Sequence, residues 1–365
     1  MKKFCFVYML MLGVIFYSCQ TVNVIPIDYL MPADISFPTQ IKRVAVVNNS
    51  NAWPGRNADS TGLDSLLLEK TNGTFEKYIL NGDPKITAES LAEAVAADNY
   101  FNEVVICDSA LQVAGIQKSE PILKKETVDE LAQLLDVDML VVLEEIQIGV
   151  QKQVYPMGAM GYLGNVDAKV YPKVNLYIPG RTAPLVMING CDSIFWEGFE
   201  NTISNARTNV VTDEQLIKEA SDFAGTIPTK YMTPQWKTVN RYFFANGSPE
   251  MRDAAFFVHS NNWDKALEIW QRAYESLKGK KKAQVASNIS LYYEMQDDLD
   301  KAEEWAIKAV ELIKAAHNIT DDSIVAGDHQ SNDLGRIYYN LMDLMKRKEN
   351  FAKLKMQMDR FHNDF

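Results

Sequence analysis

Apolar positions between residues 41 and 146 alternate between short continuous runs and helical spacing. The runs 41–47 (IKRVAVV) and 101–107 (FNEVVIC) predict buried strands. A third run, 137–146 (VDMLVVLEEI), has a continuous apolar core and predicts a central strand that is covered on at least one face. Residues 87–97 (TAESLAEAVAA) place their apolar side chains on one helical face. The pattern therefore predicts strands that alternate with helices.

Two further helices are expected in the same region. Segment 62–80 is predicted to be helical at its start (LDSLLLEK). Thr127 and Glu130 have the spacing of a capping box, in which Thr127 is the N-cap of a helix and Glu130 lies three residues further on. The expected order up to residue 146 is strand, helix, strand, helix, strand.

The apolar period becomes two after this region. Alternate residues from Val166 to Ile178 are apolar, which predicts a long antiparallel strand. Pro172 interrupts it, so the strand is expected to lie at an edge or to contain a bulge. The turn residues 179–182 (PGRT) separate it from a further strand at 185–196, and a closing helix is expected at 213–227.

These elements resemble the CsgG/LpoB-like domain of cell-envelope lipoproteins, which is related to the N-terminal domain of TolB. The resemblance rests on IKRVAVVNNSN, FNEVVICDS and LAQLLDVDMLVV, followed by the long antiparallel pair, and it covers about residues 41–230. It implies an α+β or α/β domain over 41–236, with a mixed sheet and helices. A distant resemblance of this kind constrains the fold more than the function.

An internal repeat follows residue 250. The segments NNWDKALEIWQRAYE and DDLDKAEEWAIKAVE align at a spacing of 36 residues, from Trp263 to Leu299. The repeat resembles the tetratricopeptide repeat, which implies an all-α domain of stacked helix pairs over 251–365, after a linker at 237–250. A third pair is expected at about 331–347 and 350–361. Equivalent positions alternate small and large side chains: Ala254 with Ser290, Phe257 with Tyr293, and Ala266 with Ala302.

The first residues predict export. Lys2 and Lys3 precede an uncharged apolar run, Phe4 to Tyr17, which is too short for a membrane-spanning helix and is typical of a signal peptide over 1–18. The next residues, Ser18 and Cys19, resemble the lipobox of Gram-negative lipoproteins. The resemblance implies cleavage before Cys19 and acylation of that cysteine, whereas a plain secretory signal is the alternative.

The residues after the cysteine bear on location. Gln20 and Thr21 take the place of an Asp or an acidic cluster. By resemblance to known sorting rules, this indicates the outer membrane facing the periplasm, and the cell surface is the alternative. The stretch 19–40 contains three prolines and no helical period, so it is interpreted as a tether.

The net charge bears on the classes of possible partner, and the cysteines bear on disulfide bonding. The chain has a net charge of −11, and removal of Lys2 and Lys3 with the signal takes it to −13. Nucleic acid and anionic lipid surfaces are thus disfavoured as partners. Cys107 and Cys191 remain in the mature body, either as a disulfide or as two separate buried thiols.

The sequence shows no motif for metal, cofactor or covalent chemistry. The four histidines have no ligand spacing, and the glycine-rich segment 157–164 lacks the G-K-[ST] of a phosphate loop. It is interpreted as a flexible connection between strands. The more specific hypothesis is that this loop contacts a partner protein, because residues 155–165 contain no charge. Its candidate contact residues are Tyr155, Met157, Met160, Tyr162 and Leu163.

Glu144 and Glu145 are adjacent carboxylates in the third strand. Neighbouring strand residues point to opposite faces, so the two are not expected to flank one bond, and no catalytic residue is predicted.

The leading hypothesis is a non-catalytic, lipid-anchored envelope protein, without a cofactor, that binds other envelope proteins or peptides through its helical repeats. The alternatives are a subunit of an outer-membrane secretion or assembly complex, by analogy with the curli secretion channel, and an enzyme that acts on the cell wall or glycans. The oligomeric state is left open.

Overall fold

The computed structural model describes residues 22–50, 54–56, 67, 71–107, 111, 122–319 and 332–361. The chain divides into two compact units. We call residues 33–235 with the last turn, from residue 359 onward, the sheet unit. We call residues up to 32 with 236–358 the helical unit. Cys19 and the predicted signal peptide, residues 1–18, lie outside the described residues.

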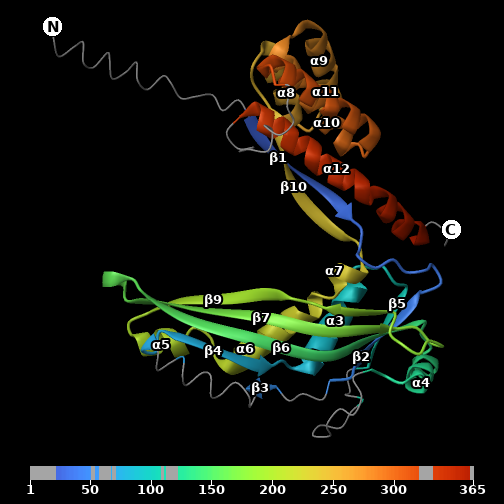
Figure 1. Cartoon of the computed structure of the whole chain (residues 1–365), viewed down its shortest axis with the longest axis vertical. Coiled ribbons are helices and arrows are strands. Elements are labelled where there is room, and N and C mark those ends of the chain that lie inside the picture. Colours follow the sequence, from blue (N-terminus) through green and yellow to red (C-terminus); the bar gives the residue numbers. More distant parts are fainter. Residues whose placement is uncertain are drawn as a thin grey trace. The chain divides into compact units, whose positions relative to one another are not determined.

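The sheet unit mixes strands and helices along the chain (Figure 1). Its strands are β2 (Arg43–Asn48), β3 (Gly55–Arg56), β4 (Phe75–Asn81), β5 (Glu103–Cys107), β6 (Met139–Pro156), β7 (Tyr162–Tyr177), β8 (Val186–Asn189) and β9 (Asp192–Glu200). Its helices are α3 (Pro84–Ala97), α4 (Lys125–Leu135), α5 (Ile203–Thr208), α6 (Asp213–Thr226) and α7 (Thr229–Met232), with the single turns η2 (Gly158–Met160) and η4 (Asp359–Phe361).

Strand β6 is long enough to pair with several other strands of this sheet. On one edge its first half pairs in parallel with β2, and its second half pairs antiparallel with β4. On the other edge it pairs antiparallel with β7. Strand β5 extends the sheet beyond β2, and β7 carries β8 and β9 on its far edge.

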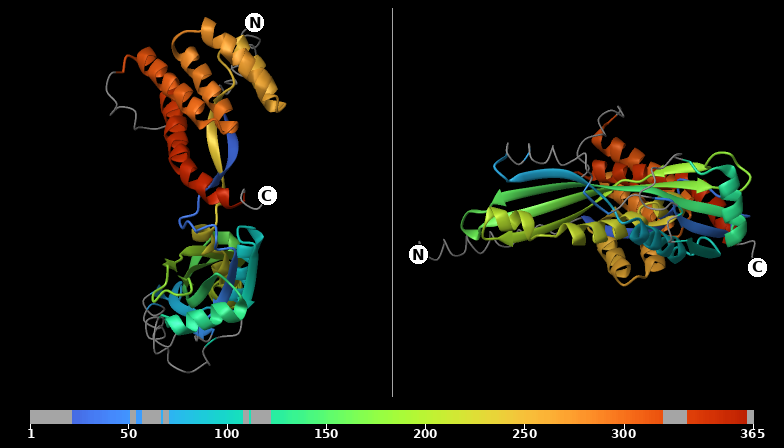
Figure 2. Two further views of the ribbon diagram at one scale, coloured as in Figure 1. Left: turned by 90° about the vertical axis from the view of Figure 1, so that its right-hand side faces the viewer. Right: turned by 90° about the horizontal axis from the view of Figure 1, so that it is seen from below.

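Helices α3 and α6 cover one face of this sheet (Figures 1 and 2). Val150, Val166 and Ala168, all fully buried, pack on that side with Leu216 and Ala220 of α6. The two helices cross closely. A Cβ on Gly225 of α6 would lie 2.7 Å from the carbonyl oxygen of Thr87 in α3, so only glycine fits there. A smaller apolar cluster on the other face packs α4 against the parallel strands.

Asp213, the first residue of α6, lies in a charged cluster on the sheet. Its carboxylate accepts a hydrogen bond of 2.8 Å from the Tyr78 hydroxyl and lies 3.4 Å from Lys152 Nζ and 3.6 Å from Arg56 Nε. Burial acts to raise the pKa of Asp213, but this hydrogen bond and the two cations outweigh it and hold the pKa below its usual value.

Several predicted boundaries in this unit are wrong. Segment 62–80 was expected to be helical at its start. That start lies almost entirely outside the described residues, and strand β4 occupies the end of the segment. Helix α4 begins at Lys125 with Lys124 as N-cap, so Thr127 is already inside the helix and caps nothing. The single strand expected at 185–196 is divided into β8 and β9.

Pro172 belongs to an interior strand rather than an edge strand. Strand β7 has β6 on one side and β8 and β9 on the other, and Pro172 lies where the second side passes from β9 to β8. The irregularity is in the partner strand, where the β6–β7 register shifts between Leu143 and Glu145. The prediction of a bulge thus points to the correct place but to the wrong strand.

In its described residues, the helical unit combines a two-stranded ribbon with five helices. The ribbon pairs β1 (Val22–Met31) with β10 (Gln235–Phe244). The helices are α8 (Pro249–His259), α9 (Trp263–Ser276), α10 (Gly279–Met295), α11 (Leu299–His317) and α12 (Asp333–Met358). The chain is therefore α+β in its sheet unit, and its C-terminal part is mainly helical. Within the described residues, no helix is both long and apolar enough to cross a membrane.

The pairs α8–α9 and α10–α11 repeat the same local geometry at the 36-residue spacing. The Phe256–Phe257 rings pack edge to face with centroids 5.5 Å apart, and the equivalent Tyr292–Tyr293 rings do so at 5.3 Å. Asn261 and Asp297 both adopt φ of 57° in the inter-helix turns. The next residue in each repeat is the N-cap of the second helix. The repeat in the sequence is thus a repeat in conformation.

Two buried asparagines cover the free edge of β10. Asn288 of α10 donates from Nδ2 to the carbonyl oxygen of Phe244 at 2.8 Å and accepts from the Phe244 amide at 2.9 Å. Asn340 of α12 makes the same pair of bonds with Tyr242, at 2.8 and 3.0 Å. Two side-chain amides therefore take the place of a third strand.

Three predictions for this unit are wrong. Residues 22–31 of the expected tether form β1, because Ile27 and Tyr29 alternate into the core and give the segment a buried face. The expected linker 237–250 contains most of β10, whose Arg241 and Phe243 are also buried. The expected third helix pair is one continuous helix, α12, since no Gly or Pro interrupts it around residue 348.

Candidate functional site

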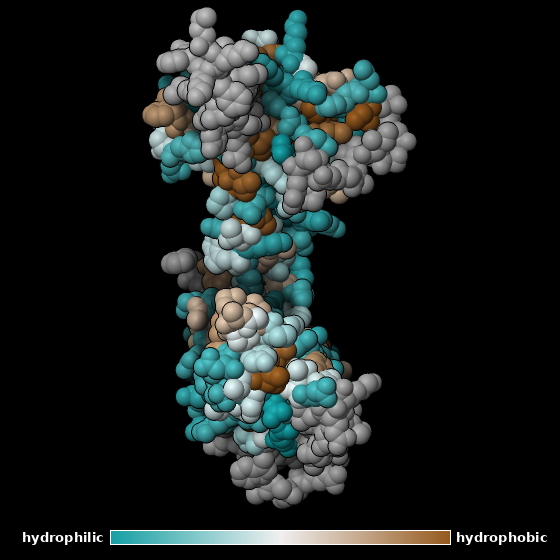
Figure 3. Space-filling view, turned by 90° about the vertical axis from the view of Figure 1, so that its left-hand side faces the viewer, coloured by the Kyte–Doolittle hydropathy of each residue, from teal (hydrophilic) through white to brown (hydrophobic). Residues whose placement is uncertain are grey.

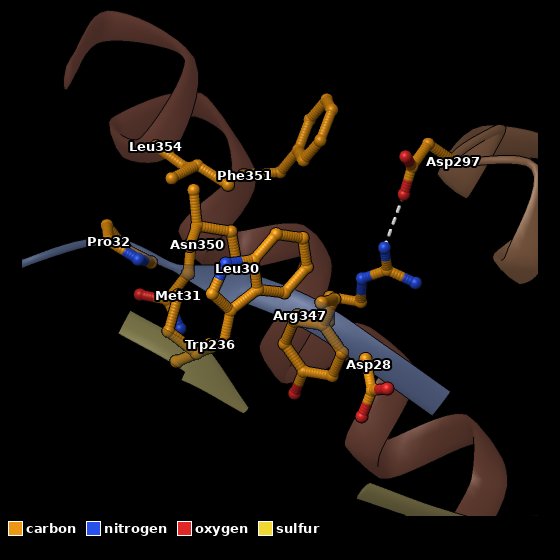
Figure 4. Close-up of a pocket in the computed structure, with 11 residues that line it drawn as sticks. Asp28, Leu30, Met31, Pro32, Trp236, Asp297, Arg347, Asn350, Phe351 and Leu354 are labelled. Atoms are coloured by element: carbon orange, nitrogen blue, oxygen red, sulfur yellow. Dashed lines mark hydrogen bonds and ion pairs between the residues drawn. The ribbon is translucent and has the colours of Figure 1, made fainter. Parts of the chain in front are cut away.

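A cavity of about 190 Å³ lies in the helical unit between the end of β1 and the second half of α12 (Figure 4). Residues 28–32 of β1 and its continuation form one wall. Helix α12 supplies four side chains at positions i, i+3, i+4 and i+7, which lie on one helical face: Arg347, Asn350, Phe351 and Leu354. Trp236 of β10 and Asp297 of the α10–α11 turn complete the lining.

Arg347 is held rigidly in the cavity wall. Its guanidinium donates to the Asp297 carboxylate and, at 2.9 Å, to the backbone oxygen of Glu294. Its Cζ lies 4.5 Å from the centroid of the Tyr29 ring. The residue is 7% exposed, and all these partners belong to the helical unit. Its hydrogen-bonding capacity is thus largely used within the protein.

A buried network of charged side chains contacts Arg347 through Glu294. Glu294 accepts two hydrogen bonds from Arg241, at 2.7 and 2.9 Å, and Arg241 also pairs with Asp343 at 2.6 Å. Burial alone would lower the pKa of Arg241, but these two carboxylates raise it, so the side chain stays charged. Burial raises the pKa of Tyr29, so this phenol stays neutral beside the network.

The open side of the cavity carries acidic and aromatic groups. Asp28 is exposed and accepts a hydrogen bond of 2.6 Å from the Thr238 hydroxyl, and the Asp297 side chain is 66% exposed. Trp236 is 75% exposed and Phe351 is 38% exposed. Among the described residues, the lining contains no His, Cys, Ser or Lys.

Sequence reasoning missed this cavity. The helical spacing of Arg347, Asn350, Phe351 and Leu354 was the only signal for it in the sequence. Trp236 and Asp28 come from segments that were interpreted as the end of a domain and as a tether, so nothing local linked them to α12.

The predicted contact residues gather at the tip of the β6–β7 hairpin. Tyr155 pairs with Leu163 in register, Met157 and Tyr162 are half-buried, and Met160 is 66% exposed. The segment connects β6 with β7, and the turn is closed by η2 and by a 2.8 Å hydrogen bond from the Met157 amide to the Gly161 carbonyl.

Neighbouring elements extend this surface. Phe199 of β9, opposite Leu163, is 62% exposed, and Ile203 of α5 is 36% exposed. The tip lies on the left-hand side of Figure 1, and Figure 3 shows the molecule from that side. Apolar patches interrupt the mainly hydrophilic surface in this view.

The carboxylates of Glu144 and Glu145 lie on the same face of the sheet, contrary to the prediction. The bulge adds one residue to β6, so Glu145 stands opposite Lys173 while Glu144 reaches Asn175 and Tyr177 on that face. Glu144 is buried and also accepts a 2.8 Å bond from Asn49. Its carboxylate is therefore held by three donors inside the protein, whereas Glu145 is exposed.

The remaining candidate groups are separate. Cys107 and Cys191 form no disulfide with each other; Cys107 is half-buried, and Cys191 is exposed at the β8–β9 turn rather than buried. In the part of the chain that the structure describes, no three His, Cys, Asp or Glu side chains are grouped as a metal would require.

The comparisons with known proteins give two family matches. The model described as "Domain of unknown function (DUF8603)" matches residues 41–244, which is more than half of the chain. The model described as "Domain of unknown function (DUF6340)" matches residues 252–342. No curated protein and no solved structure matches the chain.

Proposed function

Because this chain belongs to the family described as a domain of unknown function, DUF8603, we propose its function from its own contacts. It is a non-catalytic, lipid-anchored protein of the cell envelope that binds other proteins through its helical unit. The observation that carries the proposal is the cavity beside Trp236. A tryptophan that is three-quarters exposed at the mouth of a cavity is the kind of residue that dominates protein interfaces.

The finer fold assignments support a binding role. We propose that α8–α9 and α10–α11 are tetratricopeptide-like pairs, since their ring pairs, turns and caps repeat every 36 residues. Ala266 and Ala302 are fully buried at equivalent positions, and Ser290 donates to the Ala302 carbonyl at 2.7 Å, as a close helix crossing requires. Arrays of such pairs present binding surfaces for peptides or partner domains.

We propose that the sheet unit is CsgG/LpoB-like. Its support is the order β2, α3, β5, α4, β6 followed by the antiparallel β7, with β3 and β4 inserted after β2 and with β2 between β5 and β6 in the sheet. Acylation of Cys19 and a place at the outer membrane, facing the periplasm, complete the proposal. Their support is the signal sequence and the Ser18-Cys19 pair.

A second candidate function is a subunit of a secretion or assembly complex in the outer membrane. The observation that favours it is the β6–β7 hairpin, whose strands of 18 and 16 residues end in the apolar tip around Met160. An exposed apolar tip of this kind fits a contact with a neighbouring subunit.

Site-specific photocrosslinking in the full, lipidated chain separates these candidates. A benzoylphenylalanine is placed at Trp236, at Met160 or at Phe256, a helical-unit residue that is 69% exposed and does not line the cavity. If the helical unit binds a partner at the cavity, we expect a discrete protein adduct from position 236 and no adduct from position 256. Adducts from position 160 alone would refute the cavity as the binding site and support the assembly role.

A further inference from the structure

We propose that the cavity beside Trp236 receives one cationic side chain, a lysine or arginine from a basic segment of the partner protein. This inference rests on the proposed function and specifies the chemistry of the same site. It follows from the size of the cavity, from the charges that line it, and from the aromatic rings at its mouth.

Size limits the occupant to a single side chain. The cavity measures about 190 Å³, whereas sites for cofactors and drug-sized ligands usually measure about 300–1,000 Å³. One wall is the run 28–32 of β1, and the opposite wall is the α12 face that carries Arg347 and Leu354. A long, narrow side chain fits such a space between a strand and a helix.

The charges of the lining favour a cation. Asp28 and Asp297 contribute two carboxylates, and Arg347 is the single basic residue among the lining residues. The Arg347 charge is already balanced by Asp297 and by Glu294, whose Oε1 lies 3.6 Å away. Asp28 makes no ion pair with any described residue, and its carboxylate has only the hydrogen bond from Thr238, so no cation of the described chain balances its charge.

An anionic or apolar occupant fits less well. An incoming carboxylate would meet Asp28 and Asp297, while the guanidinium that would attract it donates to groups of the protein. An apolar side chain would remove water from the carboxylates without replacing their hydrogen bonds, which is unfavourable. A lysine or arginine can pair with a carboxylate of the lining and keep its methylene stem against the apolar lining residues.

The aromatic rings of Trp236 and Phe351 in the cavity lining also favour a cation. Elsewhere in the described chain, its own cations lie over exposed or half-buried rings, as Lys282 does over Tyr274 at 4.2 Å and Lys308 over Trp305 at 4.6 Å. No cation of the described residues lies over Trp236 or Phe351. Tryptophan is the aromatic residue that attracts cations most strongly, so its uncovered ring at the mouth of an acidic cavity is complementary to an incoming cation.

The test uses the mature chain labelled with 5-fluorotryptophan, in which the Trp236 resonance is assigned from its loss in W236F. The probes are the capped tripeptides Gly-Lys-Gly, Gly-Arg-Gly, Gly-norleucine-Gly, Gly-Glu-Gly and Gly-(Nε-acetyl-lysine)-Gly. We expect the Lys and Arg peptides to shift the Trp236 fluorine resonance in a saturable, salt-sensitive manner, and the other three to leave it in place.

The variant D28N removes one carboxylate and retains an acceptor for Thr238. We expect it to weaken Lys-peptide binding about two- to fivefold, the range of one partly exposed ion pair. The matched control D253N changes an exposed aspartate of α8 and should have no effect.

Equal shifts from the norleucine or acetyl-lysine peptide, or no shift from any peptide, would overturn the cation assignment. The protein-binding function would still stand if photocrosslinks formed at position 236, and it would fail separately if none formed.

Discussion

Replacement of Asn288 by alanine tests whether side-chain amides really complete the ribbon of the helical unit. Asn288 and Phe244 are both fully buried, and the amide makes two hydrogen bonds with the Phe244 backbone. Alanine leaves the Phe244 N–H and C=O without partners in a site that water does not reach. Each unsatisfied buried backbone group costs about 1–3 kcal/mol, so N288A should lower the free energy of unfolding by about 2–6 kcal/mol.

N340A is the matched comparison. Asn340 makes the same two bonds with Tyr242, but it is 9% exposed and Tyr242 is only half-buried, so water replaces part of what is lost. Its cost is expected to be smaller, about 1–3 kcal/mol. Helix propensity acts in the opposite direction at both positions, because alanine is a better helix former than asparagine by a few tenths of a kcal/mol.

Urea unfolding followed by near-UV circular dichroism measures both variants. Trp270 is fully buried and its ring centroid lies 5.8 Å from that of Phe243 in β10, so its signal reports on the helical unit. The reasoning would be refuted if N288A unfolded within about 0.5 kcal/mol of the parent chain, or if N340A cost more than N288A.

Three further predictions concern the sheet unit. G225A should destabilise it by about 1–3 kcal/mol in urea unfolding, although alanine favours helices, because its Cβ would meet the Thr87 carbonyl oxygen at 2.7 Å; equal or greater stability would contradict the close α3–α6 crossing. Asp213 has a lowered pKa, so its contribution to stability is present above the unfolded pKa near 4 and is lost as the pH falls through the folded pKa. The stability difference between the parent chain and D213N should therefore shrink below about pH 4, and a difference that stays constant down to pH 2 would disprove it. In a C19S chain without residues 1–18, Cys191 should react with a maleimide well before the half-buried Cys107, as mass spectrometry of the folded protein would show; equal rates would contradict their different exposure.

Local patterns predicted the elements that local sequence determines. Strands β2 and β5 and helices α3 and α6 each carry their own period, and the structure places them within a few residues of the expected positions. Strand β4 was missed because its support is distant. Its Tyr78 and Leu80 pair with Val150 and Ile148 of β6 and are buried in the core that α3 and α6 cover, and these distant partners leave no local mark in the sequence.

The cavity was hidden for the same reason. Asp28 and Thr238 touch across 210 positions of sequence, and no periodicity within either segment reveals the partner. The bulge at Glu144 shows a different limit. One additional residue in β6 reverses which face the following side chain takes, so strict alternation misplaced Glu145.

The order of the chain gives the β1–β10 ribbon a role in how the protein matures. One strand precedes the sheet unit and the other follows all of that unit except its last turn, so the helical unit stays incomplete while the intervening residues are still being made. The described strands of the sheet unit all lie within residues 43–200, and only its last turn, where Arg360 donates to the Ile41 carbonyl oxygen, comes from the late part of the chain. The Trp236 cavity, which uses β1, β10 and the late helix α12, therefore forms only after the last part of the chain has been made.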